Sequence, residues 1–281
     1  MPTIDAIISD LDDTLLNAWH QLTERTERTL KRLLDQNVKV ILASGRSAAS
    51  IRPIVERIGT PCPYIAYNGA QIVDSQTHEV LAASELPLAL ARDVLRWFEA
   101  RGVHMQYYQG DDWYVAATSE LSEAYGRSSG IPGIAAGMPL SEHIAGDTPK
   151  LLGIHDAEGM PALIEASRQV FGDRLMITTS KPYFIEITSP QATKGNAVQR
   201  LAGMIGLSPE TTICAGDSLN DVSMLEWSKL PVTVANGRDE VKRIAWQIGT
   251  EDNDHDGLAL LLDELIPPKN ATPEVVDDAH Q

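Results

Sequence analysis

Two aspartates stand two residues apart near the amino terminus, in the segment DLDDT at positions 10–14. They follow Ala6–Ile8, whose apolar residues predict a short buried strand. Carboxylates about 4 Å apart repel each other by roughly 4 kcal/mol at an effective dielectric constant near 20. Asp10 and Asp12 therefore need a bound cation or shared protons, and a hard divalent ion suits them best. Asp13 and Asn17 need no more than the usual preference of such residues for turns.

Ser44, Gly45 and Arg46 follow a second apolar strand, at positions 38–42, and precede a helical pattern that Ser47 can cap. Free backbone N–H groups ahead of a helix attract an anion, and a hydroxyl beside them can bond a phosphate oxygen. This segment alone would be a weak indication of a phosphate site.

Lys194 opens a predicted helix with an apolar stripe at Val198, Leu201 and Ile205. A lysine in the first helical turn opposes the helix dipole. An ordinary solvated lysine is the common case, but an anion or a carboxylate facing Lys194 would explain this position better. Lysine is also a good point-charge partner for phosphate.

A third apolar strand, at positions 212–214, runs into GDSLND at 216–221. Asp217 alone would fit a turn, and Asp221 alone would fit the first turn of a helix. Four such segments in one chain, each at the end of a predicted strand or the start of a predicted helix, indicate a phosphoryl-transfer site instead.

In this order the four segments resemble the four motifs of the haloacid dehalogenase-like phosphohydrolases: DLDDT at 10–14, Ser44, Lys194, and GDSLND at 216–221. The chain looks most like the Cof-type branch, because YNGA at 67–70 and ANG at 235–237 also fit that branch. The resemblance covers roughly residues 3–265.

The resemblance implies that Asp10 is the nucleophile that takes the phosphoryl group, and that Asp12 acts first as acid and then as base. It implies Mg²⁺ bound by the carboxylates of Asp10 and Asp217 and by the backbone carbonyl of Asp12, with Asp221 behind these ligands. The residues expected to hold the phosphoryl group or substrate are Leu11, Ser44, Gly45, Arg46, Lys194 and Asn220.

Alternating strand and helix patterns over residues 3–83, including a helix near Thr23–Asp35, and again over 189–265 predict an α/β core. Its sheet should be parallel, doubly wound and Rossmann-like, with the site at the carboxyl ends of the strands. We expect a catalytic core at residues 1–83 and 189–267, an inserted α+β cap at 84–188, and a disordered tail at 268–281.

Within the insertion, the patterns predict a helix at 90–98, a hairpin at 103–117, three further strands and a second helix. These strands lie at 150–155, 174–178 and 183–188, the helix lies at 160–170, and residues 126–146 are predicted to form a mobile loop. By resemblance the cap is a substrate lid. Five residues could line it, although aromatic residues at strand spacing more often belong to a core: Tyr107, Tyr108, Trp113, Tyr183 and Glu186.

The chain of 281 residues has 39 acidic and 23 basic residues, a formal net charge of -16. Nucleic acid and anionic membranes are therefore poor partners, and we expect a small phosphorylated metabolite as partner of a monomer or weak homodimer. No apolar run is long enough to span a bilayer, and acidic residues interrupt the first 16 positions. We predict a cytoplasmic protein in which Cys62 and Cys214 are inert thiols and His20 is a solvated loop residue.

Three functions fit these observations. The first is a Mg²⁺-dependent phosphatase for small phosphomonoesters, with sugar phosphates expected from the branch. The second is a phosphomutase, which would use the same two aspartates but return the phosphoryl group to another substrate hydroxyl. The third is a phosphorylatable signalling module of receiver type, against which stand Asp12 and the large insertion.

Overall fold

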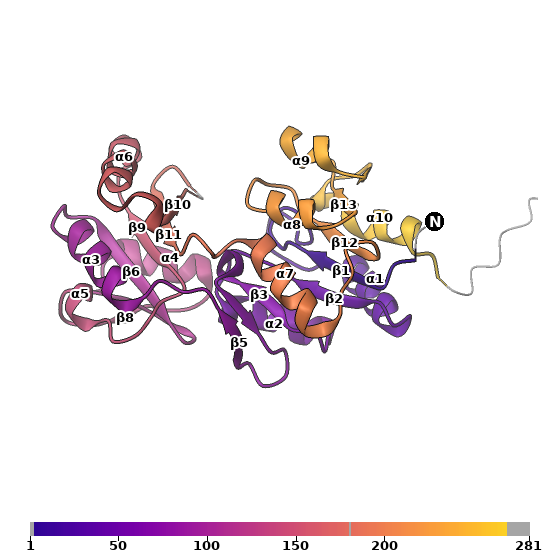
Figure 1. Cartoon of the computed structure of the whole chain (residues 1–281), viewed down its shortest axis with the longest axis horizontal. Helices are drawn as coiled ribbons and strands as arrows, with labels where there is room; N and C mark the ends of the chain where they lie inside the picture. The colour runs from indigo at the N-terminus through magenta and orange to yellow at the C-terminus, as the bar shows by residue number, and fades with distance from the viewer. Residues whose placement is uncertain (1–2, 180, 269–281) are drawn as a thin grey trace, which may run out of the picture.

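The computed structural model describes residues 3–179 and 181–268, which form two lobes joined by two chain segments (Figure 1). One lobe, the core, surrounds a parallel sheet on the right of the figure. The other, the cap, surrounds a separate mixed sheet on the left. The predicted disordered tail lies, apart from residue 268, outside the described residues.

The core sheet has five parallel strands in the order β14-β13-β12-β1-β2. Their bounds are Ala6–Ser9 for β1, Lys39–Leu42 for β2, Thr212–Ala215 for β12, Leu230–Thr233 for β13 and Gln247–Ile248 for β14. In register, Ile7 of β1 lies opposite Val40 and Ile213. The chain runs outward from β1 on one side and from β12 on the other. Strand order therefore reverses between β1 and β12, which is where parallel sheets of this kind bind ligands.

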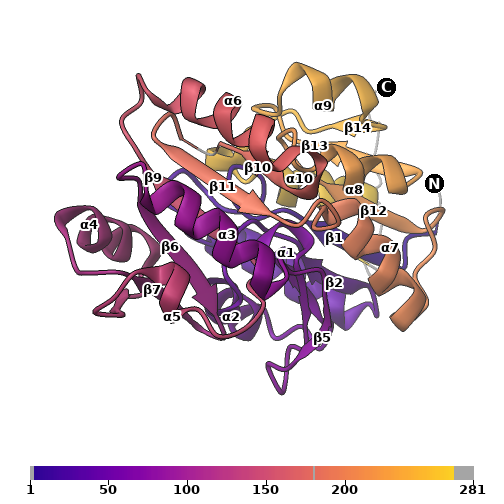
Figure 2. The ribbon, with the colours of Figure 1, turned by 60° about the vertical axis from the view of Figure 1, so that its left-hand side comes forward.

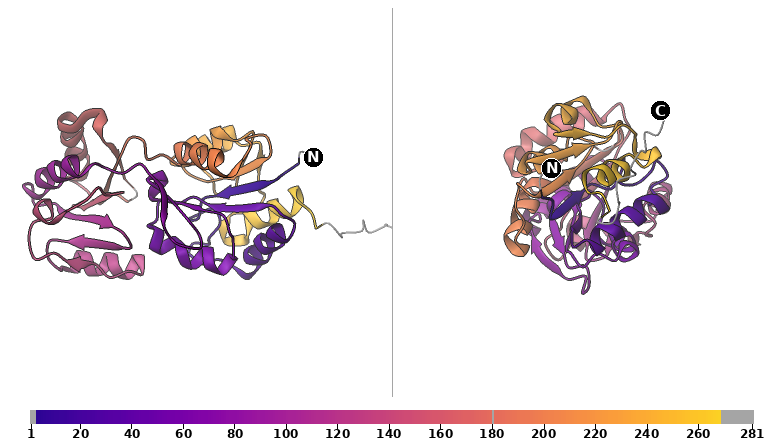
Figure 3. Two further views of the ribbon diagram at one scale, coloured as in Figure 1. Left: turned by 60° about the horizontal axis from the view of Figure 1, so that its bottom comes forward. Right: turned by 90° about the vertical axis from the view of Figure 1, so that its right-hand side faces the viewer.

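Helices cover both faces of this sheet, which lies between them in the left panel of Figure 3. One face packs against α1 (Glu24–Asp35), α2 (Ala48–Ile58) and α10 (Gly257–Leu265), and the other against α7 (Lys194–Ile205), α8 (Val222–Trp227) and α9 (Asp239–Ile244). Successive strand residues point to opposite faces, so Ile7 joins the first layer and Ile8 the second. Burial on both faces explains the apolar runs of β1, β2 and β12.

Residues 64–83 form a three-stranded antiparallel meander beside the parallel sheet, joined to it by one parallel bridge between Ala43 and Ile65. The strands are β3 (Tyr64–Ala66), β4 (Gln71–Val73) and β5 (Val80–Ala83), and the short 3-10 turn η1 (Tyr67–Gly69) connects the first two. The sequence predicted continued strand and helix alternation here. The short turns at 67–69 and 74–79 return the chain directly and leave no room for a helix.

The cap sheet has six strands in the order β10-β11-β9-β6-β7-β8, antiparallel except for the β7–β8 pair. Their bounds are His104–Gln109 for β6, Asp112–Val115 for β7, Ile134–Ala135 for β8, Leu151–Ile154 for β9, Met176–Thr178 for β10 and Phe184–Thr188 for β11. Helices α3 (Leu88–Glu99), α5 (Leu140–His143) and α6 (Met160–Phe171) share one face, as Figure 2 shows for α3 and α6. Short 3-10 turns complete the fold at Gly172–Arg174 in the cap and Asn253–His255 in the core.

The prediction of a loop at 126–146 is wrong. This segment contains the end of α4 (Glu120–Ser129), then β8 and α5. Ser119 and Ser122 form a reciprocal cap at the start of α4, and Gly130 ends it in the left-handed conformation. Tyr125 then packs edge-on against Trp113, with ring centroids 5.1 Å apart.

The predicted fold class is confirmed, since a parallel core sheet flanked by helices accompanies a separate mixed cap sheet. The predicted hairpin, strands and helices of the insertion are found within a few residues of their expected places. No helix in residues 3–179 or 181–268 has the length and apolar character that crossing a bilayer requires.

Candidate active site

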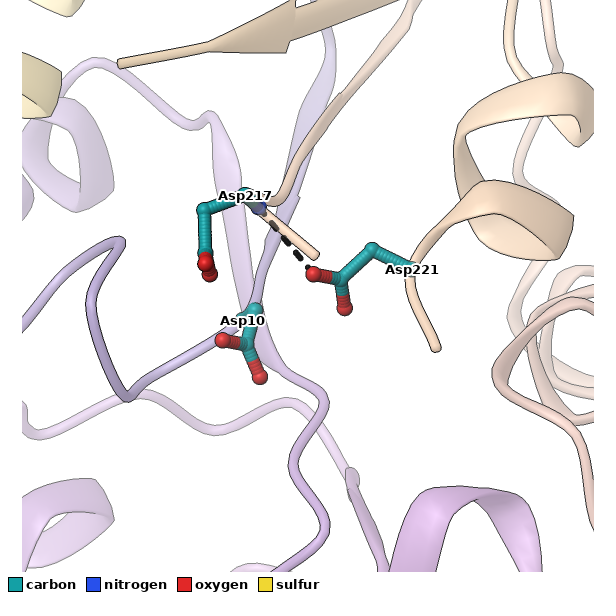
Figure 4. Close-up of side chains that lie close together, drawn as sticks. All are labelled: Asp10, Asp217 and Asp221. Atoms are coloured by element: carbon teal, nitrogen blue, oxygen red, sulfur yellow. Dashed lines mark hydrogen bonds between the residues drawn. The ribbon is translucent and has the colours of Figure 1, made fainter. Parts of the chain in front are cut away.

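Three buried aspartates meet at the carboxyl ends of β1 and β12 (Figure 4). Asp10 directly follows β1, Asp217 lies two residues after β12, and Asp221 precedes α8. One carboxylate oxygen from each lies within 4.8 Å of the others, and no residue of the three is more than 9% exposed. The motifs at 10–14 and 216–221, some 200 positions apart in sequence, thus converge because β1 and β12 pair.

Lys194 lies against this cluster and is fully buried. Its Nζ donates a 2.6 Å hydrogen bond to Asp221 Oδ1 and another to Asp10 Oδ1. Thr193 caps the helix α7 by accepting from the N–H of Asn196, which sets Lys194 in the first turn. The two carboxylates explain a lysine at a position where the helix dipole disfavours a cation.

Asp221 also holds the loop that carries Asp217. Its Oδ2 accepts from the backbone N–H groups of Asp217, at 3.1 Å, and Ser218, at 3.0 Å. A β-carbon on Gly216 would lie 2.5 Å from that of Asp221, so only glycine fits there. Thr14 Oγ1 donates to Asp217 Oδ1 at 2.8 Å, a contact the sequence analysis did not anticipate.

Burial governs the ionisation of this cluster. It raises the pKa of Asp10 well above its ordinary value, although the charge of Lys194 opposes the rise. Burial likewise raises the pKa of Asp217 to about 6, only partly offset by the hydrogen bond from Thr14. Burial alone would lower the pKa of Lys194, but Asp10 and Asp221 raise it, so the ammonium stays charged. With all three carboxylates ionised, the single ammonium of Lys194 leaves the site with excess negative charge.

Asp12 lies apart from this cluster. Its carboxylate accepts two hydrogen bonds from Arg46, at 2.8 Å from Nε and 2.5 Å from a terminal nitrogen, and lies 2.7 Å from His20 Nδ1. Burial would raise the pKa of Asp12, but the hydrogen bonds and charge of Arg46, with a smaller contribution from His20, lower it. His20 is exposed as predicted, yet it contacts a proposed catalytic residue, which the sequence did not indicate.

The predicted phosphate-binding residues differ in how exposed they are. Ser44 is buried, and its Oγ accepts from the N–H of Arg46 at 3.1 Å. Asn220 is exposed, and its Nδ2 donates to Asn68 Oδ1 at 3.1 Å. The side chain of Leu11 is fully buried, so only its backbone can contact a substrate. Arg46 is directed to Asp12 in this structure and not to an open phosphate position.

Comparison with known proteins explains this arrangement. A family model described as haloacid dehalogenase-like hydrolase matches residues 7–262. The chain belongs to the haloacid dehalogenase-like hydrolase family. Among curated relatives of this hydrolase, Phosphatase YwpJ of Bacillus subtilis is 28% identical in an alignment 288 residues long that spans 92% of this chain and 99% of that protein.

Solved structures agree with this assignment. The crystal structure of TM0651 from Thermotoga maritima has a TM-score of 0.86 and 28% identity, and covers 93% of this hydrolase and 97% of that chain. A haloacid dehalogenase-like hydrolase from B. subtilis has a TM-score of 0.80 and 26% identity, with coverage of 94% and 100%. The resemblance inferred from the four motifs is therefore confirmed at the level of the family and the fold.

The aspartate cluster of this hydrolase fits a hard divalent cation. Its donors are carboxylate oxygens, which Mg²⁺ and similar ions prefer, and all three come from buried residues that converge within 4.8 Å. A cation there would offset the excess negative charge described above. Asp221 is already bonded to Lys194 and two backbone N–H groups, so Asp10 and Asp217 have more capacity to act as ligands.

We expect this cluster to bind a divalent cation more weakly below about pH 6, because a proton on Asp217 must leave before the carboxylate can bind a cation. For one displaced proton the apparent affinity should fall about tenfold per pH unit. Without metal, the folded state binds this proton more tightly than the unfolded state. The metal-free protein should therefore lose stability as the pH rises from about 4 to about 6.

Thermal unfolding with and without Mg²⁺ at pH 5 and pH 7.5 would measure both effects. Asp217→Asn should remove most of the stabilisation by Mg²⁺ at either pH. A Mg²⁺-induced shift in melting temperature that is equal at the two pH values would contradict the role of Asp217.

Proposed function

We propose that this hydrolase is a Mg²⁺-dependent phosphatase that hydrolyses small phosphomonoesters, such as sugar phosphates, through a phosphorylated Asp10. The observation that supports it best is the buried cluster of Asp10, Asp217 and Asp221 with Lys194 bonded to its edge. The name Phosphatase YwpJ, carried by a relative of almost the same length, favours the same activity.

Asp10 would attack the phosphorus atom of the ester. Lys194 holds Oδ1 of Asp10, which leaves Oδ2 to form the new bond to phosphorus while the bond to the ester oxygen breaks. Water would then cleave the aspartyl phosphate and release inorganic phosphate. Mg²⁺, held by Asp10 and Asp217, would supply positive charge beside the phosphoryl oxygens.

Asp12 would transfer the protons of both steps, giving one to the leaving oxygen and later taking one from the attacking water. In this structure Asp12 is paired with Arg46, which favours the ionised form that acts as base. To act first as acid it must take up a proton, and the contact with Arg46 must loosen. Ser44, Gly45, Lys194 and Asn220, with the backbone of Leu11, would hold the phosphoryl oxygens.

Replacing Arg46 with methionine should raise the pKa of Asp12, because the main stabiliser of its ionised form is lost. A base has to be ionised to work, so the acidic limb of the pH profile of kcat should move to higher pH. Arg57→Met is a matched control, since Arg57 pairs with Glu27 on the surface of α1 and α2. An unchanged acidic limb in Arg46→Met would exclude this role for the Arg46–Asp12 pair.

Residues 84–188 would act as a lid that keeps water from the aspartyl phosphate and selects the leaving group. The cap touches the core where Arg52 of α2 bonds Asp111 in the turn between β6 and β7 at 2.8 Å. Tyr107 cannot line the lid, because it packs among the helices α3 and α5 on the far face of the cap sheet. The cytoplasmic location and the monomeric or weakly dimeric state of the protein stay predictions.

A panel of sugar, nucleotide and cofactor phosphates tested with Mg²⁺ would examine this proposal, with kcat/KM ranking the substrates. Mg²⁺-dependent release of phosphate over many turnovers is the expected result, and it would exclude a receiver-type module. A hexose 1-phosphate in the panel would reveal a phosphomutase by forming the 6-phosphate in place of free phosphate. If no ester in the panel is turned over, the phosphatase proposal fails.

A further inference from the structure

The turn η1 touches each of the segments that we propose to hold the phosphoryl group. The N–H of Tyr67 donates to the carbonyl of Arg46, and the N–H of Asn68 donates to the carbonyl of Ser44, both at 2.9 Å. Asn68 Oδ1 accepts from Asn220 Nδ2 at 3.1 Å. At Gly69, a β-carbon would lie 2.2 Å from the carbonyl oxygen of Thr193, the cap residue before Lys194. One short turn therefore contacts the Ser44, Asn220 and Lys194 segments together.

The backbone of this turn is unusual. Tyr67 and Asn68 have φ angles of +52° and +55°, in the left-handed region that side chains with a β-carbon disfavour. Such conformations persist where the surroundings hold them, and they cluster at functional sites. The amide of Asn68 also packs closely against the phosphate-binding loop, because a β-carbon on Gly45 would lie 3.0 Å from Asn68 Nδ2.

The cap packs on the same turn from the other side. The Tyr67 ring is buried and meets Tyr108 of β6 edge-on, with ring centroids 5.5 Å apart. Lys150 Nζ lies 5.1 Å from the Tyr108 centroid and 5.9 Å from that of Tyr67, and 3.7 Å from Glu186 Oε2. The buried charge of Lys150 thus lies over both rings, one from each lobe.

We propose that the turn Tyr67–Gly69 is a positioning element that aligns Ser44 and Asn220 for the phosphoryl group, and that the cap fixes its conformation through Tyr108 and Lys150. Asn68 acts through Ser44 and Asn220 and performs no bond-making step itself. The inference rests on the proposed phosphatase function, since it assigns the turn a role in holding phosphate.

Asn68→Gly tests the first half of the proposal, because glycine keeps the left-handed backbone and removes only the side chain. Asn37→Gly is the matched control, since Asn37 is an exposed asparagine with a φ of +64° away from the site. We expect Asn68→Gly to weaken Mg²⁺-dependent binding of orthophosphate about tenfold, comparable to losing one hydrogen bond, and to lower kcat/KM similarly. Asn37→Gly should change neither. Unchanged orthophosphate binding in Asn68→Gly, or equal weakening in both variants, would overturn the proposal.

Tyr108→Leu tests the link to the cap, with Tyr107→Leu as control. Tyr107 is the neighbouring buried tyrosine, but it lies on the opposite face of the cap sheet and stacks on Tyr114. Both variants should lower the melting temperature, whereas only Tyr108→Leu should weaken orthophosphate binding, about threefold or more. Equal orthophosphate affinity in the two variants would refute the claim that the cap fixes the conformation of the turn through Tyr108.

Calorimetric titration with orthophosphate needs no turnover, so it separates this inference from the proposed function. If the wild-type protein binds orthophosphate with Mg²⁺ but hydrolyses no ester, the phosphatase proposal fails while the role of the turn is still measured. If the wild-type protein is active and Asn68→Gly binds orthophosphate as tightly as the wild type does, this inference alone is overturned. A wild-type protein that hydrolyses esters but binds no orthophosphate would overturn the inference alone, and one that does neither would overturn both.

Discussion

Asp10→Asn is expected to abolish Mg²⁺-dependent release of phosphate, by about 10⁴-fold or more, because the amide cannot form the aspartyl phosphate. The variant should still fold. Asparagine has nearly the shape of aspartate, Lys194 keeps its bond to Asp221, and one of three crowded carboxylates is removed. Steady-state assays with a small ester, together with circular dichroism and thermal unfolding, would measure both outcomes.

Asp13→Asn is the matched control for this variant. Asp13 is exposed, three positions along in the same loop, and has a φ of +58°, which asparagine tolerates well. The Asp13→Asn variant should keep most of the wild-type activity. Mass spectrometry of quenched wild-type protein should in addition find the phosphoryl group on Asp10. Turnover by Asp10→Asn near the wild-type rate, or labelling only at another residue, would refute Asp10 as nucleophile.

Lys194→Ala is expected to reduce activity and stability together. Loss of one preorganised charged partner of the phosphoryl group should slow turnover by about 10²-fold or more. The same change leaves Asp10 and Asp221 buried without their counter-ion, and breaking a buried ion pair in this way typically costs about 3–5 kcal/mol of folding free energy. Urea unfolding and steady-state kinetics would give the two quantities.

The loss of stability in Lys194→Ala should depend on pH. Without the ammonium, the pKa of Asp10 rises further above its ordinary value, so the folded state holds its proton more tightly than the unfolded state. Stability is then lost as the pH rises, and the variant should be less impaired at pH 5 than at pH 8. Lys31→Ala, on the exposed face of α1, provides a control. A loss of activity and stability no larger than that of Lys31→Ala would contradict the proposed role of Lys194 in the active site.

The main features of the site could be predicted because they follow local patterns. Apolar strands that are followed within two residues by Asp10, Ser44 and Asp217 place polar side chains at one edge of a parallel sheet. Lys194 in a first helical turn predicted a facing anion or carboxylate, and two carboxylates are found there. In each case the signal lies within about ten residues of sequence.

Contacts between distant segments were not predictable in the same way. Arg46 could equally have faced a phosphate or an acid, and only the folded chain turns it to Asp12, 34 positions away. Thr14 and Asp217, and likewise Asn68 and Asn220, lie far apart in sequence and carry no shared pattern. The start of α4 was missed because its cap pairs Ser119 with Ser122, where a glutamate or glutamine is the usual signal.

The pairing of β1 with β12 determines the order in which parts of this chain can fold during synthesis on the ribosome. Ala6 of β1 pairs with Thr212 of β12. About 200 further residues must therefore be synthesised after β1 before β12, the strand at the centre of the sheet, can pair with it. The cap strands, by contrast, all come from one continuous stretch and can assemble while the rest is still being translated. The aspartate cluster therefore forms only late in translation, because a nascent chain truncated before β12 would lack both Asp217 and Asp221.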